Sequence, residues 1–174
     1  SKKVYTNVTS RGLPKISTFL SFWNKTINET EHYVEYEISE IKKLFIMWLK
    51  QNSLSVFKIS EELILNILNH FKNELIIEDN KFVLNIKCSL WNKELEIQET
   101  IVNFKKMILE MQYESNELMD TQTIHNIYNY YIEKSKYVKD KIIISKRYFE
   151  KYTELFLEGF IGKDGFIKSI WYEQ

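Results

Sequence analysis

The chain has 174 residues and carries 24 Lys and Arg against 24 Asp and Glu, so its formal net charge is zero. A hydrophobic content of 44%, with one proline and four glycines, provides enough core for one domain or two small ones and excludes a disordered Pro- and Gly-rich protein. Phosphate neutralisation supplies most of the affinity of a non-specific nucleic-acid binder. A neutral chain therefore needs a local basic patch to bind nucleic acid.

The single cysteine, Cys88, excludes a disulfide framework and a zinc finger, and it favours a reducing compartment. The N-terminal residues lack the pattern of a signal peptide, and no apolar run reaches the roughly 18 residues that a membrane span needs. We therefore expect an intracellular protein, in the cytoplasm or nucleus, with no membrane partner. Because the chain opens on Ser1 and not on Met, we expect it to be part of a larger protein.

Residues 1–34 are expected to form an N-terminal arm and one short helix. Residues 1–15 show little apolar periodicity, which is typical of an extended arm. Pro14 can occupy the first turn of a helix over 16–27, whose apolar face is rich in aromatic side chains. The acidic segment 29–37 is expected to be a polar connector to the next helix.

Residues 35–93 are expected to form a winged-helix-like unit, in which two helices precede a β-hairpin. Ser60 is a good N-cap, because its hydroxyl can accept a hydrogen bond from a backbone N–H at the start of a helix. Asp79-Asn80 marks the turn of the hairpin. The expected elements are a helix over 39–51 that Ser39 or a neighbour starts, a short strand over 56–59, a helix after Ser60, and strands over 75–78 and 82–86.

Residues 94–120 are expected to connect this unit to a second one, as a long helix over 95–113 and an acidic linker. Residues 121–174 are expected to form the second winged-helix-like unit, with Thr121 or Thr123 capping its first helix and Ser145 its second. Its remaining expected elements are a charged loop over 134–141, a short strand over 141–144, a helix that ends near 159, and a hairpin over 160–171.

The two units can be aligned with each other. Ile41 aligns with Ile124 at an offset of 83 positions, and Ser60 aligns with Ser145 at an offset of 85. A true duplication and the chance similarity of amphipathic helices both remain open. The expected fold class is therefore α+β and mainly helical, with two winged-helix-like units (helix, helix, β-hairpin) joined by a long helix.

Residues that could carry chemistry are scattered. His32, His70 and His125 form no close pair with metal-ligand spacing, and Cys88 beside a tryptophan is typical of a buried, inert thiol. The segment 162–165 lacks the frame of a phosphate-binding loop and is expected to be a hairpin turn. We therefore expect no enzyme, no metal site and no cofactor.

One stretch of the second unit is basic. Residues 134–151 contain seven basic residues and two acidic ones, a balance of +5, with Tyr130, Tyr131, Tyr137 and Tyr148 in or beside the stretch. Lysines can neutralise phosphates, and exposed tyrosines can stack on bases. The candidate site residues for DNA or RNA are Lys134, Lys136, Lys139, Lys141, Lys146, Arg147 and Lys151, with Lys163 and Lys168 on the hairpin.

The first unit is less suited to phosphates. Glu61 and Glu62 begin its second helix, and Glu78 and Asp79 lie at its hairpin turn. We therefore expect this unit to contact protein or only the other unit of the chain. The leading interpretation of the chain is a non-enzymatic nucleic-acid-binding module, and the alternative is a protein-interaction or assembly module, including self-association, that uses exposed aromatic faces. An ordinary solvated face is the third explanation of the basic stretch.

Three segments resemble a known family. LWNK at 90–93, ISKRYFEKY at 144–152 and EISEIKKLFIMWLK at 37–50 resemble the C-terminal, non-catalytic region of primase–helicases of nucleocytoplasmic large DNA viruses. The ATPase loop of that family is absent, so the resemblance transfers no catalytic residue. It implies an accessory region of a viral replication protein, located in viral factories, with contacts to nucleic acid or to other subunits.

Overall fold

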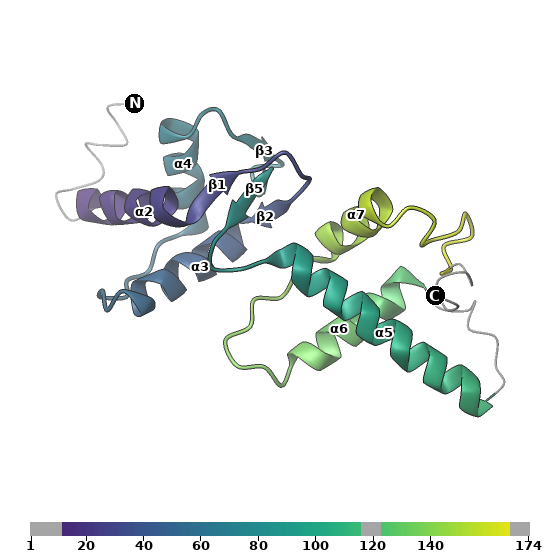
Figure 1. Ribbon diagram of the computed structural model, residues 1–174. Helices are drawn as coiled ribbons and strands as arrows, with labels where there is room; N and C mark the ends of the chain where they lie inside the picture. The colour runs from purple at the N-terminus through teal and green to yellow at the C-terminus, as the bar shows by residue number, and fades with distance from the viewer. Residues whose placement is uncertain (1–11, 116–122, 168–174) are drawn as a thin grey trace. The chain divides into compact units, whose positions relative to one another are not determined.

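The computed structural model describes residues 12–115 and 123–167. The fold is α+β and mainly helical, with six helices and two small antiparallel sheets among the described residues, which confirms the expected class. The chain divides into two compact units, unit 1 over residues 1–92 and unit 2 over residues 93–174, and each is described by itself (Figure 1).

Unit 1 contains three helices, α2 (Gly12–Thr26), α3 (Ile38–Gln51) and α4 (Glu61–Phe71) (Figure 1). The rings of α2 and α3 interlock, with Phe19 5.3 Å from Phe45 and Phe22 5.9 Å from Trp48 between centroids. All four side chains are buried. Such aromatic pairs contribute about 0.5–1.5 kcal/mol each beyond the area that they bury.

Two small sheets complete unit 1. Strand β1 (Ile27–Glu29) pairs with β5 (Ile86–Cys88), while β2 (Glu35–Glu37), β4 (Phe82–Leu84) and β3 (Ile76–Glu78) form a sheet in the order β2-β4-β3. The expected single strand over 82–86 is therefore divided. Asn85 has a positive φ of 59°, a conformation that asparagine tolerates, and the chain changes sheets at this residue.

The segment 29–37, expected to be a polar connector, instead ends β1 and forms β2. Tyr36 is buried, and its hydroxyl donates to the carbonyl oxygen of Trp91 at 3.0 Å and accepts from the N–H of Cys88 at 3.3 Å. Glu35 is also buried and accepts a hydrogen bond from the Tyr33 hydroxyl. A glutamate that is buried in a sheet has the sequence signature of a surface residue, which explains the wrong prediction.

Three of the predicted N-caps are confirmed. The hydroxyls of Ser60, Thr123 and Ser145 accept from backbone N–H groups at 3.0, 3.3 and 3.2 Å. Helix α3 begins one residue earlier than predicted, after Glu37, whose N–H donates to Oε1 of Glu40 at 2.7 Å.

Two expected strands are wrong. Residues 56–59 and 141–144 have no strand structure, and none of the strands in the described part of the chain pairs with them. In the first segment Ile59 is buried, and in the second Ile142 and Ile144 are buried. The apolar residues that suggested strands therefore anchor irregular segments to the core.

Unit 2 contains α5 (Lys93–Ser115), α6 (Ile124–Ser135) and α7 (Lys146–Phe156) (Figure 1). Helix α5 packs against α6, and the ring of Phe104 lies 5.6 Å from that of Tyr130. The Tyr131 hydroxyl accepts from the N–H of Ile144 at 2.9 Å, which fixes the segment before α7. Helix α7 ends at Phe156, earlier than the expected 159.

The hairpin of unit 2 is short within the described residues. Ile161 forms a bridge with Ile167, and the turn between them uses Gly165 at a φ of 83°. The expected part of the hairpin beyond residue 167 lies outside the described residues, as do the first expected arm residues and most of the acidic linker.

The two units share an order of pairings. In unit 1, β2 precedes α3 and pairs with β4, the second strand of the β3–β4 hairpin. In unit 2, Thr123 precedes α6 and forms a bridge with Phe166, in the second arm of the hairpin. In each unit a helix, a strand or bridge residue, two helices and a hairpin follow one another.

Candidate nucleic-acid interface

The end of α6 and the turn that follows it, here called the basic turn and defined as residues 134–141, hold the most exposed part of the basic stretch. Lys134, Lys136 and Lys139 are all exposed. The N–H of Lys136 donates to the carbonyl oxygen of Ile132 at 3.2 Å, so the helical direction continues just past the end of α6 at Ser135. The backbone thus positions three cations in a short, defined segment.

Tyr137 lies among these lysines and is 87% exposed. The next residue, Val138, is 52% exposed and completes an apolar tip that the sequence did not mark. The Val138 N–H donates to the carbonyl oxygen of Ser135 at 3.1 Å, and Ser135 is itself buried and donates to the Tyr131 carbonyl oxygen at 2.7 Å. The tip is therefore presented to solvent by an ordered turn.

The structure separates the four tyrosines that the sequence grouped. Tyr131 and Tyr148 are buried in the core of unit 2, and burial raises the pKa of the Tyr131 hydroxyl above its ordinary value. Tyr130 is half-buried, with the Lys134 ammonium 5.5 Å from its ring centroid. Of the four, Tyr137 alone offers an open ring face to a ligand.

Lys141 is held within unit 2 by an ion pair and an aromatic ring. Its ammonium lies 2.6 Å from Oε1 of Glu96 and 5.0 Å from the ring centroid of Tyr131. Its side chain is 22% exposed, and that of Glu96 is 18% exposed. Lys141 therefore attaches the basic turn to α5 and has little surface left for a phosphate.

The basic residues of α7 are mixed with acids. Lys146 is exposed and lies 3.8 Å from Oε1 of Glu150 and 3.2 Å from Nδ1 of His125. Arg147 and Lys151 are half-buried and make further interactions within the fold. Lys163 is exposed on the hairpin, and Lys168 lies outside the described residues.

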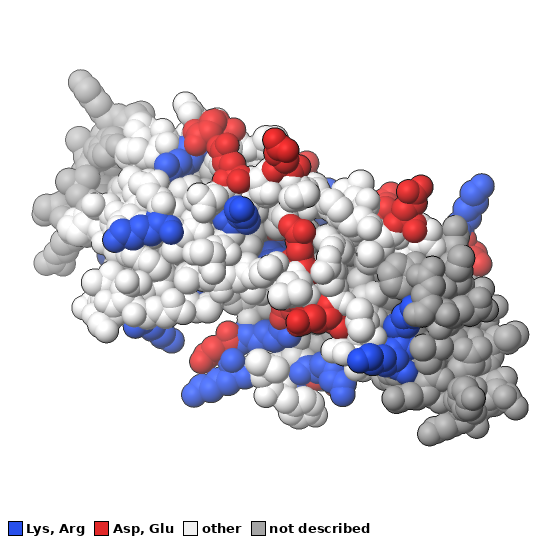
Figure 2. All heavy atoms as spheres, in the orientation of Figure 1, with Lys and Arg blue, Asp and Glu red and all other residues white. Residues whose placement is uncertain are grey.

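Charges of both signs occur on the face of the molecule that Figure 2 shows. Figure 2 shows Lys and Arg interspersed with Asp and Glu among the coloured residues of the face in view. The candidate interface is therefore the basic turn, a local feature whose Lys134, Lys136 and Lys139 are exposed.

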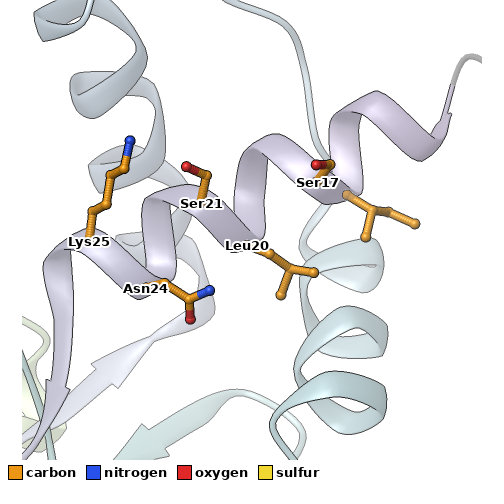
Figure 3. A pocket seen from close by; sticks show the side chains of 6 residues that line it. Ser17, Leu20, Ser21, Asn24 and Lys25 are labelled. Atoms are coloured by element: carbon orange, nitrogen blue, oxygen red, sulfur yellow. The ribbon is translucent and has the colours of Figure 1, made fainter.

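A shallow hollow of about 610 Å³ lies along α2 (Figure 3). All six of its lining residues come from this one helix, whereas small-molecule sites usually draw their lining from several elements. Asn24, at its edge, accepts a hydrogen bond from Lys72 at 2.9 Å. The hollow is therefore a surface feature of α2 and a weak candidate for a ligand site.

Other reactive groups provide no site within residues 12–115 and 123–167. No group of three or more His, Cys, Asp or Glu side chains is placed there to hold a metal ion. Cys88 is buried, and burial raises the pKa of its thiol, which lowers its nucleophilicity at neutral pH.

No family model, curated protein or solved structure matches the chain. Within the described residues, no helix combines the length and the apolar character that crossing a membrane requires.

Proposed function

We propose that the chain is a non-enzymatic nucleic-acid-binding module that forms an accessory part of a larger, intracellular viral replication protein. The observation that carries the proposal is Tyr137, which is 87% exposed in a turn with three exposed lysines. An exposed ring offers a face on which a base can stack, and lysines around it favour a partner with phosphates.

We also propose that each of the two units has a winged-helix arrangement. Its support in unit 1 is the β2-β4-β3 strand order around α2, α3 and α4. In unit 2 the bridges from Thr123 to Phe166 and from Ile161 to Ile167 occupy the corresponding places. Glu61, Glu62 and Asp79 are exposed in unit 1, so we assign the phosphate contacts to unit 2.

The role in viral replication has separate support. The segment ISKRYFEKY at 144–152, which resembles the non-catalytic region of the viral primase–helicases, spans most of α7, directly after the basic turn.

The direct test measures binding of a labelled oligonucleotide by fluorescence anisotropy at 50–200 mM salt. Three phosphate contacts predict a slope of log affinity against log salt of about −2, because single strands lose roughly 0.7 per contact. The triple variant Lys134→Glu, Lys136→Glu, Lys139→Glu is expected to lose most of its affinity for the oligonucleotide. Any binding that remains is expected to depend little on salt concentration.

The matched control reverses three lysines of unit 1, Lys43, Lys50 and Lys58, which are exposed as well. It changes net charge by the same amount and is expected to keep most of the affinity. Equal losses in the two triple variants would show a non-specific charge effect, and absence of binding by the unmodified chain at 50 mM salt would refute the proposal.

A second candidate function has its own observation. Leu155 is 58% exposed and Phe156 is 39% exposed at the end of α7, and large apolar side chains that are exposed close together in the chain favour an interaction surface there. We propose self-association or docking through this end of α7 as the alternative. Light scattering over a concentration series, with Leu155→Ser as the variant, is expected to show a concentration-dependent assembly that the substitution weakens, and a monomer at all concentrations would refute self-association.

A further inference from the structure

Duplexes and single strands require different surfaces of a protein. A duplex presents two ridges of phosphates around a groove, into which a helix places its side chains. A single strand presents unstacked bases, which bind to exposed aromatic rings while nearby cations contact the backbone. The exposed side chains of α7 and of the basic turn can be compared with these two requirements.

Helix α7 is poorly suited to a duplex. Glu150 and Glu154 are exposed along it, and Glu158 is exposed just after its end. A helix with this surface would bring carboxylates close to the phosphates on either side of a groove, which is electrostatically unfavourable.

The basic turn meets the requirements of a single strand. Tyr137 supplies an open ring, and its neighbours Lys136 and Lys139 supply cations on both sides in sequence. Lys134 precedes the ring by three residues and also lies over the half-buried Tyr130. One open ring with lysines on both sides of it in sequence suits a strand in which bases and phosphates alternate.

The ion pair of the basic turn does not prevent this contact. Lys136 lies 2.6 Å from Oε1 of Glu133, with the two side chains 56% and 63% exposed. Exposed pairs of this kind are weak and are screened by salt. A phosphate can therefore replace the carboxylate of Glu133 at small cost.

We propose that the basic turn binds single-stranded nucleic acid, with one base stacked on Tyr137 and the backbone phosphates beside Lys134, Lys136 and Lys139. This inference rests on the proposed function and adds to it the form of the ligand. Stacking on a ring does not depend on base identity, so the binding is tolerant of sequence.

The test uses the full chain with a labelled 12-nucleotide strand, as DNA and as RNA, and a 12-base-pair duplex of mixed sequence. We expect at least one of the strands to bind about tenfold more tightly than the duplex. Tyr137→Ala is expected to weaken strand binding about tenfold and to leave duplex binding unchanged, since loss of one stacked base has roughly this effect. Tyr137→Phe retains the ring and is expected to bind as the unmodified chain does.

Val138→Ala is the matched control, because it removes exposed apolar surface from the same tip without removing a ring. It is expected to change strand affinity less than twofold. Circular dichroism of each variant checks that the fold is intact, which an 87% exposed side chain leads us to expect.

The outcomes separate the inference from the proposed function. Equal affinity for strand and duplex, with loss of both in the lysine triple variant and no effect of Tyr137→Ala, would overturn the single-strand inference and leave the nucleic-acid module standing. No binding of any oligonucleotide would overturn both. Anionic lipid vesicles form a further arm, and binding to vesicles that depends on Tyr137 while strand binding does not would also overturn the inference.

Discussion

Removal of the Lys141 side chain is expected to destabilise unit 2 and to leave nucleic-acid binding nearly unchanged. The ammonium lies 2.6 Å from Oε1 of Glu96, and the two side chains are 22% and 18% exposed. Lys141→Ala leaves a carboxylate in a mostly buried place without this partner. The Tyr131 hydroxyl, 3.4 Å from Oε2 of Glu96, can only partly replace it.

The magnitude follows from the exposure of the pair. Fully exposed pairs contribute about 0.2–1 kcal/mol, whereas removal of one partner of a buried pair costs about 3–5 kcal/mol. A pair that keeps about a fifth of its exposure lies between these limits, nearer the lower one once solvent screening is included. We expect a loss of about 1–2 kcal/mol, which is about 5–10 °C in Tm for a unit of this size.

Thermal unfolding followed by circular dichroism measures this loss. A double-mutant cycle with Glu96→Gln isolates the interaction, and we expect a coupling energy of about 1 kcal/mol. Lys139→Ala is the control, since this exposed lysine is two residues away and its removal should change stability by less than about 0.5 kcal/mol. If Lys141→Ala kept the Tm of the unmodified chain and lost strand binding, Lys141 would belong to the interface and the assignment would be wrong.

Three further predictions concern the fold. Burial raises the pKa of Tyr131 and, with less effect, that of Tyr152. Their contribution to stability is therefore complete below pH 10 and is lost as pH rises above it. The Tm measured from pH 9 to 12 should fall, and it should fall less steeply in Tyr131→Phe. Ser145→Ala should lower the unfolding free energy by about 1 kcal/mol in urea titration, because the N-cap hydrogen bond of α7 is lost, whereas Ser145→Asp should retain it. Asn85→Ala should cost about 1–2 kcal/mol in the same assay because of its positive φ, and an equal effect of Asn85→Gly would show that the side chain and not the backbone matters.

Local signals predicted much of the helical framework. Ser60 and Ser145 are N-caps in the structure as in the sequence, because a cap depends on residues within one turn of the chain. Strands were predicted less well, since pairing depends on distant segments. Strand β2 contains Glu35, whose burial follows from pairing with Leu84, about fifty residues away, and no local pattern contains that information.

The candidate site likewise combines features that depend on neighbouring residues in the chain with features that depend on distant ones. The sequence identified the basic stretch, but it treated Lys139 and Lys141 as equivalent. Their difference arises from Glu96 on α5, which lies far away in the sequence and close to Lys141 in space. Likewise, exposure separates Tyr137 from Tyr131, and exposure is a property of the packed unit.

The connections between the second and third helices of the two units differ in their exposed residues, and this difference supports the proposal that unit 2 binds nucleic acid. They occupy the same place in the order of elements, after α3 in unit 1 and after α6 in unit 2. The connection in unit 1 exposes the aliphatic side chains of Leu54 and Val56, whereas that in unit 2 exposes Tyr137 with its lysines. The helices that follow have the same serine cap and an amphipathic core face, so packing accounts for what the units share. The exposed residues of the two connections account for how the units differ. For this reason we propose that the connection in unit 2 binds nucleic acid and that the helices around it have a structural role.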